Sequence, residues 1–559
     1  MIINIGVFIL EDNRLDIQFS IFNLKDRRPS SVLLVDYFEN ASPYFGERFP
    51  KDDPFYELIE PAFATGDFTG KWKQGTILYT YGKLPEARIM LLGLGNKDEI
   101  TPFKVKIAFG YALKHLASHN VKEVTAFIDK KCCAGEFCSI SEFLAEAAYM
   151  SQYRHPSYKK VRAESFPPVE QINLILPEGI DHESISELSK GVQEGKMTGS
   201  VVNEVRTLVD MPSNFMNPTG LANHARKIAR ENASITCQVF EKDELITMGM
   251  GGLVNVGKGS HEPPCMIQCV YTPEENKVNR TIAIVGKGVT FDSGGICIKP
   301  DQGMERMKDD MAGAAITLGI IKLAAMLKLP IKLVGLMPCC ENMPGGDAIK
   351  PGDIITAYDG TSVEVINTDA EGRLILMDAL GYAVKQKADA IIDLATLTGA
   401  CTVALGRFVI GGMTNHQPIM NLLRESGDSI YERVWQFPLM EEYKLQLKSI
   451  FADLKNHGGR EGGAIVAGAF LSHFVGKVPW IHLDIAGVTW FDTETSLYPD
   501  GASGIGVRLV VDFLRKLCSK DYPDIWSQQA TSIDGPTYKE NEVSMGHPSS
   551  PFRRNVILG

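Results

Sequence analysis

The 559-residue sequence lacks the features of several common protein classes. No run of uninterrupted apolar residues approaches the roughly 18 that a membrane-spanning helix needs, so no membrane segment is expected. The 11 cysteines are an odd number and form no C-x-x-C pair, which is typical of a reduced, cytoplasmic chain. Lys and Arg number 57 against 68 Asp and Glu, and the resulting net charge of −11 argues against a nucleic-acid partner.

The composition is that of a globular protein, with 44% hydrophobic and 22% charged residues. At about 150 residues per domain, the length predicts two to four domains. The apolar segment 1–10 has no basic leader and runs into charged residues, so it is predicted to be a first strand rather than a signal peptide. Cys132, Cys133 and Cys138 could form a metal site, but the nearest histidine, His119, lies on another predicted element.

The first third of the chain has the pattern of one α/β unit. Short apolar runs that end at glycine or charge predict buried strands at 31–36, 87–95, 123–128 and 171–176. Helical periodicity predicts helices at 105–117 and 142–149. The stretch 185–208 is predicted to be a helix that bridges to the next unit, although Gly191, Gly195 and Gly199 interrupt it.

Strands and helices alternate again after Pro212. Strands are predicted at 281–286, 331–337, 363–366 and 390–394, and helices at 312–329 and 374–387. This spacing indicates a mainly parallel sheet covered on both faces, with chemistry in the loops beyond the carboxyl ends of its strands. The predicted fold is therefore two-domain α/β: a smaller N-terminal α/β domain (1–183), a linker helix (184–208), a larger domain with a mainly parallel central sheet flanked by helices (209–517), and an irregular C-terminal tail (518–559).

Three acidic clusters lie in the larger domain near strand ends, glycine turns or helix starts. They contain Asp292, Asp310 and the pair Asp369 and Glu371. The members of that pair stand two residues apart after an apolar strand, so in extended chain both would face the same side. Two like charges so close to a buried sheet need a counter-charge, and a pair of divalent cations can supply it. Together the four carboxylates are enough oxygen ligands for a two-metal site.

Ordinary structural explanations remain open for some of these acids. Asp309 and Asp310 precede a predicted helix, where acids commonly cap the helix or offset its dipole. Asp292 stands before Ser-Gly-Gly and could be a turn residue. The motifs of other common catalytic and nucleotide-binding sites are absent, because the chain has no H-E-x-x-H motif, no complete P-loop and no G-x-G-x-x-G. No histidine falls in the acidic segments, and such an oxygen-rich site suits Mn²⁺, Mg²⁺ or Zn²⁺.

The block Asn-Thr-Asp-Ala-Glu-Gly-Arg-Leu at 367–374 resembles the signature octapeptide of the leucyl aminopeptidase (cytosol aminopeptidase) family. The similarity covers roughly residues 205–517 and includes the segments 286–299, 309–315, 396–400, 453–456 with 458–460, and 484–488. The residues before 185 fit the family's more variable amino-terminal domain only in outline, and the tail beyond Leu517 is longer than the resemblance leads us to expect.

The resemblance implies two divalent cations, Zn²⁺, Mn²⁺ or Mg²⁺, bridged by Asp292 and Glu371. Lys287 and Asp310 would complete the tighter site, and Asp369 would complete the more exchangeable one. As a ligand, Lys287 needs its neutral amine, and the adjacent divalent charge would lower its pKa accordingly.

The resemblance also assigns two catalytic cations. Lys299 would stabilise the oxyanion of the reaction, and Arg373 would hold a bicarbonate ion that carries the proton. For Arg373 a salt bridge to a neighbouring acid is an alternative explanation.

The implied activity is hydrolysis of the N-terminal residue of peptides, with Leu and other apolar residues preferred, by a water activated between the two metals. The positions that resemble an apolar substrate pocket are Met307, Thr396, Leu397, Gly399 and Ala486, and each could instead be ordinary core packing. The family is usually homohexameric, and the same is expected here in the cytoplasm. One alternative is a catalytically silent structural paralogue that keeps the fold and oligomer. DNA binding, known in some bacterial relatives, conflicts with the net negative charge.

Overall fold

The structure is a computed structural model that describes residues 15–23, 28–44, 49, 52–127, 137–160, 167–176, 181–275, 279–519 and 525. The predicted strand at 1–10, the cysteines at 132 and 133 and nearly all of the tail lie outside the described residues. Within these ranges, no helix is both long and apolar enough to cross a bilayer.

The N-terminal unit is a six-stranded sheet in the order β1-β6-β5-β2-β4-β3, parallel except for the edge strand β3. The strands are β1 (Gln18–Asn23), β2 (Val32–Phe38), β3 (Gly75–Tyr79), β4 (Arg88–Gly95), β5 (Glu123–Phe127) and β6 (Gln171–Leu176). The strands predicted at 31–36, 87–95, 123–128 and 171–176 are confirmed.

Both faces of this sheet are covered, which explains its continuous apolar runs. Alternate residues of β2 point to opposite faces, so Leu33 and Val35 pack beneath α2 (Pro54–Ala64). Val32 and Leu34 pack on the other side with α3 (Pro102–Ala117) and α4 (Phe137–Ser151). The short 3-10 helix η2 (Lys97–Glu99) precedes α3.

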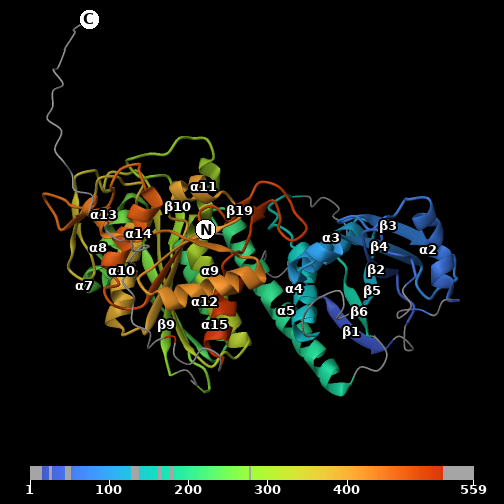
Figure 1. Ribbon diagram of the computed structural model, residues 1–559. Coiled ribbons are helices and arrows are strands. Elements are labelled where there is room, and N and C mark those ends of the chain that lie inside the picture. Colours follow the sequence, from blue (N-terminus) through green and yellow to red (C-terminus); the bar gives the residue numbers. More distant parts are fainter. Residues whose placement is uncertain are drawn as a thin grey trace, which may run out of the picture.

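Helix α5 (His182–Asp210) runs without interruption from the N-terminal unit to the larger one (Figure 1). The prediction that Gly191, Gly195 and Gly199 interrupt it is wrong. A Cβ atom at Gly191 or Gly195 would overlap the backbone of α4, and one at Gly199 would lie 2.6 Å from Cβ of Tyr149. The three glycines lie four residues apart on one face, so their role is to let two helices approach closely.

The larger unit is built on a sheet whose main path is β16-β15-β18-β14-β9-β11-β8-β7, with β10 also paired to β11. Its core from β18 to β11 is parallel, and antiparallel pairs occur only towards the two edges. The strands are β7 (Ile235–Phe240), β8 (Cys265–Tyr271), β9 (Thr281–Gly286), β10 (Gly288–Asp292), β11 (Lys332–Asn342), β14 (Ala390–Ala395), β15 (Ile410–Thr414), β16 (Val434–Gln436) and β18 (Trp480–Asp484).

Helices cover both faces of this sheet and form a separate apolar core on each (Figure 1). One core contains residues of α5, α6 (Pro218–Glu231), α9 (Ala312–Met326), α12 (Gln417–Ile430) and α15 (Val507–Leu517). The other contains residues of α7 (Lys242–Met248), α8 (Gly251–Val256), α10 (Gly372–Lys385) and α14 (Gly463–His473). The two-domain α/β class with a mainly parallel central sheet is confirmed.

The remaining elements are short and lie outside the main sheet. They are η3 (Gly257–Gly259), η4 (Met304–Met311), α11 (Gly399–Leu405), α13 (Glu441–Leu445), the small sheet β12 (Ile354–Thr356), β13 (Ser362–Glu364) and β17 (Leu454–Lys455), and the pair β19 (Trp490–Phe491) and β20 (Gly501–Ala502). The strand predicted at 363–366 is therefore β13, which belongs to the small sheet rather than to the main one.

Buried charges join the two units. Arg508 of α15 places Nε 3.0 Å from Oε2 of Glu146 in α4 and Nη1 3.2 Å from Oε1 of Glu432, and Glu146 also pairs with Lys106 of α3. All four side chains are buried. Because removing one partner would leave an uncompensated buried charge, this network fixes the contact between α3, α4 and α15.

Candidate metal centre

The candidate centre lies at the carboxyl ends of neighbouring strands, where parallel sheets commonly place their chemistry. Lys287 follows β9. Its backbone N–H donates to the carbonyl of Leu394 in the neighbouring strand β14 at 3.0 Å. Asp292 is the last residue of β10. The parallel order of β10, β11, β9 and β14 therefore brings residues far apart in sequence to one edge.

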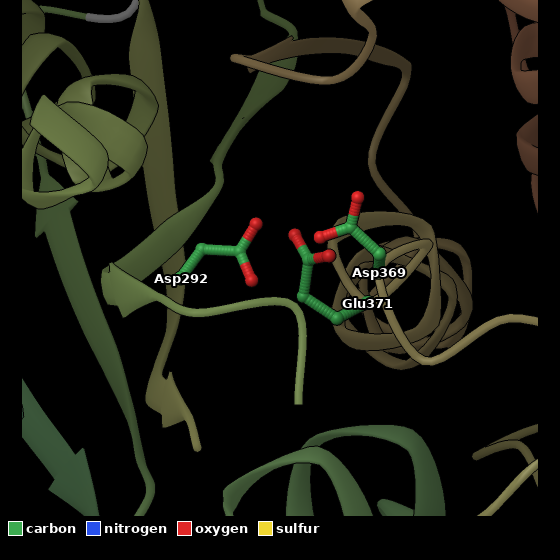
Figure 2. A group of neighbouring side chains, drawn as sticks. All are labelled: Asp292, Asp369 and Glu371. Atoms are coloured by element: carbon green, nitrogen blue, oxygen red, sulfur yellow. The ribbon is translucent and has the colours of Figure 1, made fainter. Parts of the chain in front are cut away.

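Three of the predicted acids converge at this edge. Asp292, Asp369 and Glu371 each offer a carboxylate oxygen within 4.8 Å of those of the other two. Figure 2 shows the carboxylates of Asp369 and Glu371 on one side and that of Asp292 on the other, pointing towards one another. Asp292 and Glu371 are buried, whereas Asp369 is partly exposed.

The reason predicted for the approach of Asp369 and Glu371 is wrong. Extended chain would have aimed both side chains to one side, but β13 ends at Glu364 and Asp369 lies in a turn. Glu371 has α-helical dihedrals and directly precedes α10. The turn and the helix start, rather than a strand, bring the two carboxylates together, with the Asn367 side chain accepting from the backbone N–H of Asp369 at 2.9 Å.

Lys287 joins the fourth acid to the cluster. Its Nζ lies 2.7 Å from Oδ1 of Asp310 and 2.7 Å from Oε1 of Glu371, and it donates to the carbonyl of Thr396 at 2.9 Å. Asp310 lies on the 3-10 helix η4 and its Oδ1 also accepts from the Thr396 hydroxyl at 2.7 Å. The capping explanation for Asp310 is not supported, because α9 has no side-chain cap at its N-terminus.

Lys299 is the second lysine that forms ion pairs with the clustered acids. Its Nζ lies 2.7 Å from Oδ2 of Asp292 and pairs with Oδ1 of Asp369. The turn explanation for Asp292 holds in part, since its Oδ1 accepts from the backbone N–H of Gly294 at 2.9 Å. Its other oxygen faces the cluster, so the residue both shapes the turn and contributes a charge to the site.

The charges of this site do not balance. Four carboxylates against the ammonium groups of Lys287 and Lys299 leave −4 + 2 = −2 in a largely buried place. Burial and the neighbouring Glu371 raise the pKa of Asp292 to about 6, and burial raises that of Asp310 well above its usual range. Burial opposes the charge on Lys287, but Asp310 and Glu371 outweigh it and raise the pKa of the amine. Asp292 and Asp310 therefore have too little positive charge beside them. At Glu371, by contrast, Lys287 and Lys299 outweigh burial and lower the pKa of the carboxyl group.

This donor set fits divalent cations. The two ammonium groups occupy positions between carboxylates, where cations are required, and Oδ2 of Asp310 is buried without a hydrogen-bond partner among the described residues. Carboxylate oxygens and one amine are ligands that Mn²⁺, Mg²⁺ and Zn²⁺ accept. One divalent cation would cancel this deficit, and two would leave a single positive charge once Lys287 has lost its proton to act as a ligand.

Arg373 lies in the first turn of α10, two residues after Glu371. Its guanidinium donates to the carbonyl of Asn456 at 2.8 Å, and its Nε has no hydrogen-bond partner among the described residues. Burial lowers its pKa to about 10. The alternative of a salt bridge is not seen, because no described carboxylate lies within ion-pair distance of this side chain.

The predicted pocket residues lie on three segments around the acids. Met307 is on η4, three residues before Asp310, so the two side chains project from the same side of that 3-10 helix. Thr396, Leu397 and Gly399 follow β14, and Ala486 follows β18. A Cβ atom added at Gly399 would meet no heavy atom within 4 Å, so this position borders open space.

Asp484 ties two of these segments together. Its Oδ1 accepts from the backbone N–H groups of Leu397 at 3.3 Å and Ala486 at 3.2 Å, and its Oδ2 accepts from the Thr398 hydroxyl at 2.7 Å. Sequence reasoning gave this buried acid no role. Its position at the end of an apolar strand was the available signal.

Asn342 was also missed. It ends β11, is buried, and donates from Nδ2 to Oδ1 of Asp292 at 2.8 Å. In the sequence Asn342 is an uncharged polar residue that follows Glu341 at the end of the apolar run of β11. Because its side chain is neither charged nor a usual metal ligand, residue type alone does not single it out.

Both the sequence and the structure are similar to those of known proteins. The sequence model of the cytosol aminopeptidase family, catalytic domain, matches residues 203–511, and that of the family's N-terminal domain matches residues 50–162. A probable cytosol aminopeptidase of Geobacter sp. (strain M21) is 43% identical over 453 residues, covering 81% of this chain and 90% of the relative. One of Nitrosococcus oceani is 36% identical over 492 residues, covering 88% and 96%.

A solved structure is also similar. The bottromycin maturation enzyme BotP in complex with Mn superposes with a TM-score of 0.76 at 28% sequence identity. The match covers 88% of this chain and all of that one.

Proposed function

The chain belongs to the cytosol aminopeptidase family, and from that premise we propose that it removes N-terminal residues from peptides, Leu and other apolar residues being preferred, with the help of two divalent cations. The metal-dependent aminopeptidase activity follows from the family. The observation that carries the two-metal assignment is the convergence of four carboxylates and the Lys287 amine in a buried site with fewer positive than negative charges.

We assign the cations to Lys287, Asp292, Asp310, Asp369 and Glu371. Asp292 and Glu371 would be shared, Lys287 and Asp310 would complete one site, and Asp369 would complete the other. Bound cations would activate a water and polarise the first peptide carbonyl. Mn²⁺, Zn²⁺ and Mg²⁺ all suit the donor set, and the Mn bound to the similar enzyme BotP favours Mn²⁺ for a first experiment.

Lys299 and Arg373 have separate roles in this proposal. Lys299 stays an ammonium, because Asp292 and its neighbours raise its pKa against the effect of burial. A charged donor fixed at this edge can stabilise the oxyanion that forms when the peptide carbonyl is attacked. Arg373 keeps a buried N–H unused, and a bicarbonate ion is a planar acceptor of the right charge for such a guanidinium.

The preference for an apolar N-terminal residue is assigned to Met307, Thr396, Leu397, Gly399 and Ala486. The support is their position on three segments that flank Asp310, with open space beside Gly399. The hydrogen bonds of Asp484 hold the two loops of this pocket in a fixed relative position. A free amino terminus would lie towards the acids, which explains cleavage of only the first residue.

We also propose that the chain assembles as a homohexamer and works in the cytoplasm. Val403 is 90% exposed, Phe408 80%, Ile450 89% and Phe451 69%, and all four belong to the larger unit. Contiguous apolar patches on a surface mark contact sites, and we propose that these four side chains belong to such a contact surface. Light scattering of the purified chain should give six times the mass of one chain, and a monomer would contradict the assembly.

The test of function is release of the dye from an N-terminal leucyl anilide by the purified protein with added Mn²⁺. Turnover that disappears with a chelator and returns with Mn²⁺ supports the proposal. The alternative is a catalytically silent structural paralogue that keeps the fold and oligomer. A folded hexamer without turnover in Mn²⁺, Zn²⁺ or Mg²⁺ would favour that alternative.

A further inference from the structure

One buried amide links the two segments that carry the clustered acids. The Nδ2 group of Asn342 donates to Oδ1 of Asp292 at 2.8 Å and to the carbonyl of Thr368 at 3.0 Å. Asp292 ends β10, whereas Thr368 immediately precedes Asp369 in a distant loop. Both protons of one NH₂ group are therefore used to hold these segments at a fixed separation.

The surroundings fix Asn342 in turn. Its backbone carbonyl accepts from the backbone N–H of Ser293 at 3.0 Å and from the Ser293 hydroxyl at 2.7 Å. In parallel register Asn342 is the partner of Asp292 itself. The Thr368 hydroxyl donates to the carbonyl of Gly294 at 2.6 Å, so the same two segments meet a second time. The amide is held on a strand, which allows little freedom to adjust.

The hydrogen bonds also decide which oxygen of Asp292 is free. Oδ1 receives two N–H groups, from Asn342 and Gly294, whereas among the described residues Oδ2 pairs with the ammonium of Lys299 alone. A ligand carboxylate whose one oxygen is anchored presents the other in a fixed direction.

We propose that Asn342 is a positioning residue of the metal centre, which sets the separation of Asp292 from Asp369 and thereby the affinity for the cations. This inference rests on the proposed function, because it takes these acids as ligands. Outer partners of metal ligands typically contribute a factor of about 10–100 to metal affinity.

The test measures Mn²⁺ binding rather than turnover, by the electron paramagnetic resonance signal of free Mn²⁺ in titrations of metal-free protein. Asn342→Ala and the similarly sized Asn342→Leu should each weaken binding by about 10–100-fold. Asn173→Ala is the matched control, because Asn173 is an equally buried asparagine in the N-terminal sheet that donates to Glu123 and Thr125.

The outcomes separate this inference from the proposed function. Wild-type protein that binds no Mn²⁺ would contradict the proposed metal centre itself. Wild-type binding with unchanged affinity in folded Asn342→Leu would overturn the role of Asn342 alone. A loss of melting temperature in Asn342→Ala that is matched by Asn173→Ala, without a selective loss of Mn²⁺ affinity, would mean that Asn342 acts only in folding.

A second, independent observation concerns two thiols far from this centre in sequence. Cys237 on β7 and Cys269 on β8 are directly opposite in an antiparallel pair. Opposite residues have Cα atoms about 4.5–5.5 Å apart, which lies within the range of disulfides. Neither thiol is in a disulfide, so both are available to react.

The pair lies where a reagent can reach it. β7 ends the sheet path, and Cys237 is half-buried whereas Cys269 is buried. The neighbouring Cys269 thiol and the charge of Arg226 on α6 lower the pKa of the Cys237 thiol against the effect of burial. The thiolate is the nucleophile in cysteine chemistry, so Cys237 is the member that would react first.

A second cross-strand pair provides an internal comparison. Cys265 on β8 and Cys339 on β11 are also directly opposite, but both are buried and β11 is an interior strand. Burial raises the pKa of Cys339 well above its usual range. Geometry is thus similar in the two pairs, whereas access and thiolate character differ.

We infer that Cys237 and Cys269 are an oxidisable dithiol whose co-reactant is a hydroperoxide. The Cys237 thiolate would attack the peroxide, forming an S–O bond as the O–O bond breaks and one oxygen leaves as hydroxide. The Cys269 sulfur would then attack the resulting sulfenic acid, forming the disulfide and releasing water after proton transfer. The sum is two thiols and one hydrogen peroxide to one disulfide and two waters.

The experiment treats the full chain with hydrogen peroxide, blocks free thiols with N-ethylmaleimide and identifies linked peptides by mass spectrometry. A 237–269 disulfide should form and dithiothreitol should reverse it. The bond would close a loop containing α7 and α8, so the oxidised chain should melt at a higher temperature than the reduced one. Cys237→Ser and Cys269→Ser should each abolish the shift, whereas Cys265→Ser should keep it. Absence of the 237–269 peptide, or equal linkage of 265 and 339, would overturn the inference.

Discussion

The Nζ atom of Lys287 lies 2.7 Å from Oε1 of Glu371, and both side chains are buried. A Cβ atom at Gly372 would lie 2.6 Å from Cε of Lys287, so the glycine after Glu371 leaves room for the lysine stem. The ion pair therefore depends on a glycine at that position. Without metal, the Lys287 amine in this pair is protonated, and it must lose that proton before it can bind a cation.

Binding of Mn²⁺ should strengthen as pH rises. Lys287 is protonated without metal because the neighbouring acids raise its pKa, and it must lose that proton to bind. Asp292, with a pKa raised to about 6, must also be ionised, so binding should fall further below pH 6. Calorimetry in two buffers of different ionisation enthalpy should show proton release at neutral pH. Binding that is independent of pH and releases no proton would contradict Lys287 as a ligand.

Asp369→Asn should abolish turnover and lower the number of Mn²⁺ ions bound per chain, because one carboxylate of the cluster becomes neutral. The oligomer should persist, since Asp369 is partly exposed at the site and its carboxylate forms an ion pair with Lys299 and with no other cation that the structure describes. Asp309→Asn is the matched control on η4, an acid next to Asp310 but outside the cluster, and it should remain active. Metal analysis by mass spectrometry and light scattering check both points. Retained turnover in Asp369→Asn would refute its assignment.

Lys299→Gln should lower kcat about 100–1000-fold, which is typical of losing one oxyanion donor. Mn²⁺ affinity should stay the same or rise, because an ammonium no longer competes for Asp292 and Asp369. Lys308→Gln is the control, since Lys308 donates to the carbonyl of Asp210 outside the cluster. Steady-state kinetics at saturating Mn²⁺ measure the effect. A loss of metal with unchanged kcat in the loaded enzyme would assign Lys299 to metal binding instead.

Gly399→Val should shift the substrate preference from leucyl towards alanyl anilides. Space is open beside Gly399, so the new side chain can be accommodated by the fold while it fills the proposed pocket. A change of this size in a hydrophobic pocket is typically worth about 10–200-fold in relative kcat/KM. Gly346→Val, also beside open space but outside the proposed pocket, is the control. An unchanged ratio of leucyl to alanyl kcat/KM would exclude Gly399 from the pocket.

Gly195→Ala should lower the melting temperature, although alanine favours helices by about 1 kcal/mol over glycine. The added Cβ would overlap the Glu142 carbonyl in α4, and overpacking of this kind costs about 1–3 kcal/mol. Gly381→Ala in α10 is the matched control, because its nearest neighbour would be at an ordinary 3.5 Å, and it should be neutral or stabilising. Differential scanning calorimetry measures whether each variant melts at a lower or a higher temperature than the wild type. A stabilised Gly195→Ala would show that α4 and α5 do not pack as closely as described.

Much of the fold could be predicted because its signals are local. The apolar runs at 281–286 and 390–394 became β9 and β14 almost residue for residue, since a strand covered on both faces needs continuous apolar side chains. The glycines of α5 were misjudged for the opposite reason. Glycine lowers helix propensity wherever it occurs, but only the partner helix α4 shows why it is needed there.

The candidate site was likewise predictable where its signals are local and unpredictable where they depend on tertiary contacts. Asp369 and Glu371 were marked by the octapeptide, and charge alone suggested that they need cations. Their convergence with Asp292 depends on the parallel pairing of β10 with β11 and on the turn before α10. Asn342, an uncharged residue at a strand end, carried no signal of its own and is recognisable only by its two hydrogen bonds.

The sequence by itself therefore determined the class of protein, the succession of strands and helices, and the residue types available for a metal site. The tertiary structure decided which of these residues meet, which oxygen of each acid is free, and which thiols are paired across strands. The physical reason is that propensity and apolar periodicity act over a few neighbouring residues. Burial, charge balance and hydrogen bonding depend on groups up to hundreds of residues away, which only the folded chain brings together.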